Sequence, residues 1–110
     1  MSNDKKYNGW TNYETWLINL WMSEGSNYYD DLAQELFNNK EDSQDKEDLI
    51  NDLSNRLKQE HEEYIETVKL PSSGWITDLI NASLSEVDWY EIAEHYISEV
   101  WDEDKIAKVV

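Results

Sequence analysis

Negative charge is the feature that most constrains how this chain can fold. The sequence holds 25 Asp and Glu residues against nine Lys and Arg, which gives a formal net charge of −16 over 110 residues. High net charge with low hydrophobicity is typical of disordered chains. Here six Trp and seven Tyr accompany the acids, and large aromatic side chains supply the apolar area that a core requires. We therefore expect a folded domain that holds its carboxylates on a fixed surface.

The apolar residues recur at helical spacing. Runs at i, i+3, i+4 and i+7 predict five helices, and no strict alternation is long enough to predict a strand. The helices are expected over residues 12–22, 27–38, 44–68, 75–84 and from 88 onward. Pro71 ends the third and longest one, because proline disfavours a helical conformation in the residue before it. The expected fold is all-α, a compact single-domain bundle of about five helices with one long central helix.

One domain is the natural organisation for a chain of this length. We expect a helical domain over residues 10–104, a flexible segment at 1–9 and a tail at 105–110. The tail can extend the last helix, add a short strand or stay loose. The chain has no cysteine, which excludes disulfides and thiolate metal sites. It also shows no membrane span and no signal peptide, so we expect a soluble, cytoplasmic protein.

Capping residues and aromatic positions add detail to this expected fold. Thr11 with Glu14, and Asp88 with Glu91, fit the capping-box pattern at the start of a helix. Either Asp42 or Ser43 is expected to cap the third helix. Five tryptophans lie on apolar stripes and are expected in the core, namely Trp16, Trp21, Trp75, Trp89 and Trp101. Trp10 precedes the first helix and can pack on the core or lie exposed.

The acids are concentrated in two places. Residues 86–104 contain eight acids and no Lys or Arg, and at 100° per residue several of these acids fall within one ~80° arc of the last helix. Like charges at such spacing destabilise a helix by a few tenths of a kcal/mol per pair, which favours a functional reason for their presence. The residues expected to contact a partner are Asp88, Glu91, Glu94, Glu99, Asp102, Glu103 and Asp104, with Glu62, Glu63 and Glu66 as a second cluster.

This placement suggests that the carboxylates imitate nucleic-acid phosphates. One helical turn advances ~5.4 Å, so acids one or two turns apart roughly bracket neighbouring phosphates on a strand. Proteins that bind DNA gain most of their non-specific affinity from phosphates, and an acidic surface can occupy the same Lys and Arg cleft. The negative charge itself repels nucleic acids and anionic membranes. The expected partner is therefore a basic DNA-binding protein, and the alternative is that the acids serve only solubility.

The sequence offers little for catalysis or metal binding. Glu91, His95 and Glu99 stand at i, i+4 and i+8, but no further His or Cys completes a site, and the Glu-x-x-His pairs of di-iron bundles are absent. Neither a phosphate-binding glycine loop nor a nucleophile motif is present. We expect no enzyme activity, no metal and no cofactor.

Two segments of the chain resemble a known family. They are YNGWTNYETWLINLW at residues 7–21 and DLINASLSEVDWYEIAE at 78–94. They look like a mostly uncharacterised family of small acidic proteins carried by bacteriophages and plasmids, found beside antirestriction and other counter-defence genes. The resemblance implies a counter-defence role in the cytoplasm of a bacterial host. It identifies no target and no catalytic residue.

Our leading hypothesis is a nucleic-acid mimic that inhibits a host defence nuclease. It would block the DNA-binding cleft of a Cas or restriction complex, as anti-CRISPR and antirestriction proteins do. The alternative is a non-catalytic interaction module, such as an adaptor, an assembly factor or an antitoxin-like cap. An adaptor would use an aromatic groove, where Trp10 and Tyr28 would matter. A homodimer also remains open, because two-fold pairing extends a charged surface.

Overall fold

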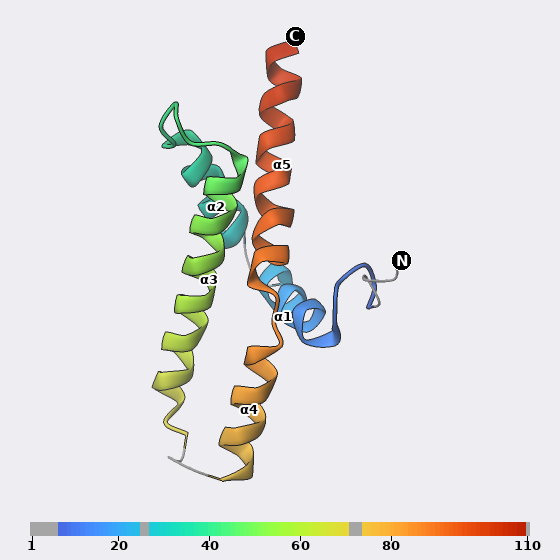
Figure 1. Cartoon of the computed structure of the whole chain (residues 1–110), viewed down its shortest axis with the longest axis vertical. Coiled ribbons are helices and arrows are strands. Elements are labelled where there is room, and N and C mark those ends of the chain that lie inside the picture. The colour runs from blue at the N-terminus through green and yellow to red at the C-terminus, as the bar shows by residue number, and fades with distance from the viewer. Residues whose placement is uncertain (1–6, 25–26, 71–73, 110) are drawn as a thin grey trace.

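The computed structural model describes residues 7–24, 27–70 and 74–109, and the side chains of its last helix as far as Trp101. These ranges form α1 (Tyr13–Glu24), α2 (Tyr28–Asn38), α3 (Lys46–Val68), α4 (Trp75–Ser85) and α5 (Trp89–Val109) (Figure 1). The all-α fold and the long third helix are confirmed. The expected stop at Pro71 lies outside the described residues, and α3 ends at Val68, with Lys69 in a left-handed conformation at φ 62°.

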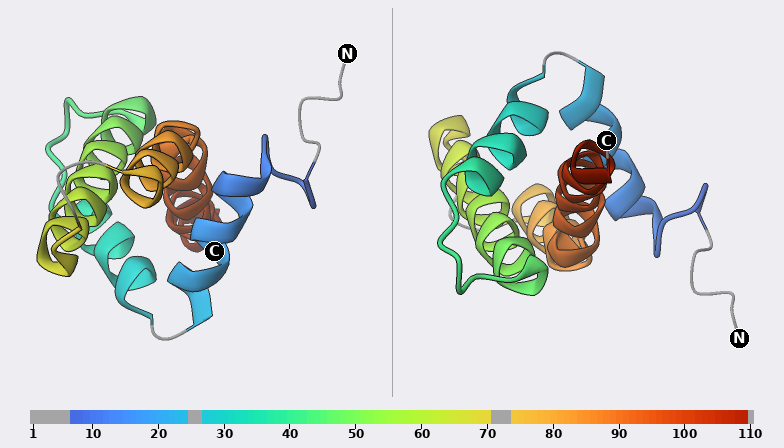
Figure 2. Two further views of the ribbon diagram at one scale, coloured as in Figure 1. Left: turned by 90° about the horizontal axis from the view of Figure 1, so that it is seen from below. Right: turned by 90° about the horizontal axis from the view of Figure 1, so that it is seen from above.

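The last helix organises the bundle. α5 contacts α1, α2 and α3, with α1 on one side of it and α2 and α3 on the other (Figure 2). α4 runs antiparallel beside the end of α3, and the two helices extend away from the other elements (Figure 1). We call residues 62–70 together with α4 the arm. The molecule measures 56 × 35 × 27 Å along its principal axes.

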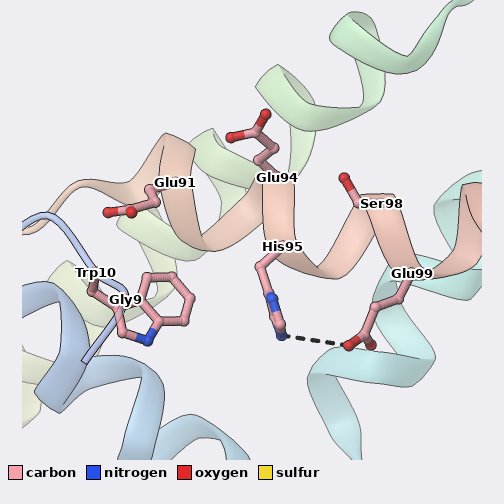
Figure 3. A pocket seen from close by; sticks show the side chains of 7 residues that line it. All are labelled: Gly9, Trp10, Glu91, Glu94, His95, Ser98 and Glu99. Atoms are coloured by element: carbon pink, nitrogen blue, oxygen red, sulfur yellow. Dashed lines mark ion pairs between the residues drawn. The ribbon is translucent and has the colours of Figure 1, made fainter. Parts of the chain in front are cut away.

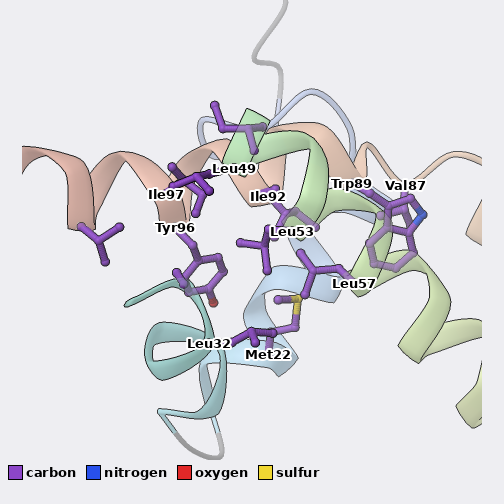
Figure 4. Close-up of a cluster of buried hydrophobic side chains, with 14 residues drawn as sticks. Met22, Leu32, Leu49, Leu53, Leu57, Val87, Trp89, Ile92, Tyr96 and Ile97 are labelled. Atoms are coloured by element: carbon purple, nitrogen blue, oxygen red, sulfur yellow. The ribbon is translucent and has the colours of Figure 1, made fainter. Parts of the chain in front are cut away.

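The core lies between α3 and α5 (Figure 4). Leu53 and Leu57 of α3 and Ile92 and Ile97 of α5 are completely buried. Each such side chain contributes about 1.5–3 kcal/mol through its removal from water. The remaining buried apolar residues are Met22, Leu32, Ala33, Leu49, Ile50, Val87, Trp89, Ala93, Tyr96 and Val100. Because α5 supplies six of these fourteen buried residues from one side, its opposite side is left for polar residues.

Two of the five tryptophans expected in the core are exposed. Trp21 is 70 % exposed and Trp75 is 74 % exposed. α1 carries apolar residues all round, so spacing alone did not identify its buried face, which carries Thr15 and Met22. α4 buries none of its residues, since little of the bundle reaches it. Trp89 is buried, while Trp16 and Trp101 are half-buried.

The helix caps differ from the expected ones by one to three residues. α1 begins after Asn12, whose Oδ1 accepts a hydrogen bond from the Thr15 N–H at 2.9 Å. Thr11 is therefore not its cap. α3 is capped by Asp45 rather than by residue 42 or 43, because Asp45 and Asp48 form a reciprocal pair. The Asp48 N–H donates to Asp45 Oδ1 at 3.0 Å, and the Asp45 N–H donates to Asp48 Oδ2 at 3.1 Å.

Secondary structure is present at both ends of the expected helical domain. Tyr7 and Trp10 exchange two backbone hydrogen bonds of 2.9 and 2.8 Å around a tight turn. Its central residues, Asn8 and Gly9, have φ of 50° and 93°, which suits the Asn-Gly pair. Residues 7–9 are thus part of the fold, whereas 1–6 lie outside the described residues. At the other end the helix continues to Val109, the first of the three alternatives for the tail.

Candidate acidic interface

The start of α5 is tied to the start of α1 by hydrogen bonds. Thr15 is completely buried, and its Oγ1 accepts from the Asp88 N–H at 2.9 Å. Asp88 in turn caps α5, because its Oδ1 accepts from the Glu91 N–H at 3.1 Å. The Asn12 side chain donates to the Glu86 carbonyl at 2.7 Å. We call these residues the clasp, and through it each helix satisfies backbone groups at the start of the other.

Glu91 also belongs to this clasp, against the prediction that it lies on an exposed acidic face. It is only 7 % exposed, and its Oε1 accepts from the Thr11 N–H at 3.1 Å. Its position in the first turn of α5 suits a carboxylate, because the N-terminal end of a helix favours negative charge. The cap by Asp88 is confirmed, but Glu91 does not complete the expected capping box. Thr15 takes that place because α1 packs across this end of α5.

A groove lies beside the clasp, along the outer side of α5 (Figure 3). It has a volume of about 520 Å³ and is lined by Gly9, Trp10, Glu91, Glu94, His95, Ser98 and Glu99. The Trp10 ring meets the His95 ring edge-on, with 5.5 Å between their centroids. His95 Nε2 lies 3.5 Å from Glu99 Oε2. Glu94 and Glu99 are both exposed, as predicted.

A second groove continues from the first across to α2. It has a volume of about 330 Å³ and is lined by Asp30, Asp31, Gln34, Tyr96, Glu99 and Val100. Glu99 is common to both grooves, and no Lys or Arg lines either of them. We call Asp30, Asp31, Glu94 and Glu99 the acidic track. Burial, together with the charges of Asp30 and Glu99, raises the pKa of Tyr96 to about 12, in keeping with a strongly negative surface.

The three acids of α3 that were predicted to bind a partner are not gathered at this track. Glu62 and Glu66 line a groove between α3 and α4, whereas Glu63 lines a different groove with Asp52 and Arg56. Consecutive helical residues point about 100° apart, which separates Glu63 from the other two. Asp102, Glu103 and Asp104 continue along α5, and their side chains lie outside the described residues.

Sequence reasoning missed the contribution of α2 to the track. Asp30 and Asp31 stand in the first turn of that helix, and the sequence pattern assigned them no role. They join Glu99 only because α2 packs on α5.

A family model matches residues 3–106 of the chain. The chain belongs to DUF7249, a family of unknown function. No curated protein and no solved structure matches it. The DUF7249 match includes both sequence segments singled out above, at 7–21 and 78–94, and the structure brings these segments together. The clasp is built entirely from them, so their polar residues serve the joining of α1 to α5.

Among the side chains that the structure describes, no group of three His, Cys, Asp or Glu is placed to hold a metal ion. Glu91 turns to Thr11 rather than toward His95 and Glu99. Within the same part of the chain, no helix combines the length and apolar character that a membrane span needs.

Proposed function

We propose that this protein is a non-catalytic inhibitor that occupies the basic nucleic-acid-binding cleft of a partner protein. The observation that carries the proposal is the acidic track, where two helices place exposed carboxylates along adjoining grooves that no Lys or Arg lines. Surface acids are ordinarily interspersed with bases, which stabilise the fold through ion pairs. Here the carboxylates of Glu94 and Asp31 keep their charge available to a partner.

The net charge of −16 supports this function through long-range steering. A field of this sign raises the rate of encounter with a basic surface and repels nucleic acid itself. We extend the proposal to a nuclease of bacterial defence, either a Cas or a restriction complex. Such enzymes hold DNA in clefts rich in Lys and Arg, and the resemblance of residues 7–21 and 78–94 to phage and plasmid proteins implies that setting.

The alternative function, an adaptor that binds its partner through an aromatic groove, has less support. Trp10 is half-buried and packs against the core and the His95 ring. The Tyr28 hydroxyl donates to Glu60 Oε2 at 2.9 Å, which raises the pKa of Tyr28. Both rings therefore have partners within the fold, although Tyr28 is 47 % exposed.

The test is competition with DNA. The tagged chain is used to capture proteins from a bacterial host lysate at 50 mM salt, and each captured protein is titrated with a DNA duplex. We expect a DNA-binding protein that releases its duplex when this chain is added, with binding that weakens steeply as salt rises. Binding that survives high salt, or that leaves the duplex in place, contradicts the proposal.

A pair of matched variants locates the contact. Glu94→Gln with Glu99→Gln removes two charges from the acidic track, and we expect binding to weaken roughly tenfold or more. Asp42→Asn with Asp52→Asn removes the same charge from exposed positions elsewhere, and binding should remain close to that of the original chain. Equal losses from both variants would show that net charge, and not the track, determines binding.

A further inference from the structure

The arm carries a surface of large apolar side chains that nothing in the described chain covers. Two of them, Tyr64 and Trp75, are 68 % and 74 % exposed. The others that are exposed here are Val68, Ile76 and Leu79. Single exposed apolar residues are normal on proteins, but a contiguous group of this size marks an interaction surface.

These side chains lie on one face of the arm. At 100° per residue, Tyr64 and Val68 continue the stripe of Leu53 and Leu57, which are completely buried. The stripe therefore runs on past the point where the bundle covers it. On α4, Trp75 and Leu79 are one turn apart.

The position of α4 beside α3 determines which way the second stripe, Trp75 and Leu79 of α4, faces. Ile65 lines their shared groove together with Leu84, so α4 lies about 100° around α3 from Tyr64. With the two helices antiparallel (Figure 1), helical geometry turns Leu79 to the same side as Val68. By this geometry the two stripes face the same side of the arm.

The charge of this surface favours a second copy of the chain as its occupant. The arm as a whole has four acids, Glu62, Glu63, Glu66 and Asp78, against one base, Lys69, but its end, residues 67–85, holds only Asp78 and Lys69 and so has no net charge in a chain of −16. Two copies that met through the acidic track would repel each other strongly. Two copies that meet through the end of the arm bring together surfaces with little net charge. A basic partner, by contrast, is attracted more strongly to the track than to the end of the arm.

The size of the surface also suits a dimer. Given the usual areas of aromatic and aliphatic side chains, the exposed part of these residues amounts to roughly 500 Å². A stable interface takes about 800 Å² from each partner, and in homodimers about 65 % of that area is apolar. The exposed apolar area of the arm therefore matches what one copy contributes.

We propose that two copies of this chain pair through their arms in a symmetric dimer. Each arm supplies α4 and the end of α3, and Trp75 is the central anchor of the contact. The pairing does not depend on the proposed function. It leaves both acidic tracks free, so the dimer can bind two basic surfaces or one long one.

The test measures the mass of the full chain in solution. Sedimentation equilibrium at 1–100 μM should give twice the 13.1 kDa of one chain, and salt should leave the dimer unchanged or tighten it. Trp75→Glu should weaken pairing by about 30-fold or more, while the far-UV circular dichroism remains that of a folded helical protein. Leu79→Glu is a second variant with the same expected result.

A matched control separates the arm from general hydrophobicity. Trp21 is exposed to almost the same extent as Trp75 but lies on α1, outside the arm, so Trp21→Glu should remain dimeric. A chain that is monomeric at 100 μM overturns the proposal and leaves the arm to a different partner. A dimer that Trp21→Glu breaks and Trp75→Glu preserves overturns it as well. Neither result affects the competition with DNA, which fails or succeeds separately.

Discussion

Replacing Thr15 by valine tests whether the clasp holds α1 to α5. Valine has nearly the shape of threonine, so the packing of this completely buried side chain is retained. What is lost is the hydroxyl that accepts the Asp88 N–H at 2.9 Å. That N–H then faces a methyl group at a half-buried position, and a buried donor without an acceptor costs about 1–3 kcal/mol. We expect Thr15→Val to lower the free energy of unfolding by about 1–2 kcal/mol.

The matched control is Thr15→Ser, which keeps the hydroxyl and removes only a methyl group. Its cost should be about 1 kcal/mol, through lost burial alone. Both variants are measured by urea unfolding, followed by tryptophan fluorescence and by circular dichroism, because the two signals together check for a single transition. If Thr15→Val proved as stable as the original chain while Thr15→Ser was weaker, packing would hold the two helices and the clasp would contribute nothing.

Three further changes test the remaining parts of the fold. Glu91→Ala should destabilise the chain by about 1.5–3 kcal/mol, because a buried charged hydrogen bond is lost, whereas the exposed Glu94→Ala should stay within about 0.5 kcal/mol in the same urea titration. Leu57→Ala should cost about 2–5 kcal/mol, measured as a lower urea midpoint, because a completely buried side chain leaves a cavity. Burial and neighbouring acids raise the pKa of Tyr96 to about 12, so the stability linked to it is present below about pH 10 and is lost as pH rises toward 12. A Tyr96→Phe variant should show a flatter fall in melting temperature over that range.

The helices were predictable because their signal is local. Spacing of apolar residues placed five helices correctly, and the Asp88 cap followed from the residue types at the start of α5. Burial was less predictable, since it depends on which face of a helix meets a neighbour. Trp75 has the spacing of a core residue, yet α4 lies beside only the end of α3 and leaves it exposed.

The candidate interface, too, was predictable only where the signal is local. Helical spacing identified Glu94 and Glu99 as exposed acids of α5. It also placed Glu91 with them, because a helical wheel contains no information about the Thr11 segment that covers it. Asp31 was missed for the opposite reason, since it joins the track only through packing between helices distant in sequence. For both Glu91 and Asp31, the position relative to the track depends on contacts between segments that are distant in sequence.

The energetics of α5 explain how its outer side can remain so acidic. Like charges one turn apart cost a few tenths of a kcal/mol per pair. On the inner side, Ile92 and Ile97 are completely buried, and each contributes about 1.5–3 kcal/mol. The clasp adds hydrogen bonds at the first turn. Because burial exceeds repulsion several-fold, the fold tolerates an acidic outer side that it does not need for its own stability. The absence of Lys and Arg from the lining of both grooves is thus a property that folding does not require, and the proposed binding to a basic surface would give it a reason.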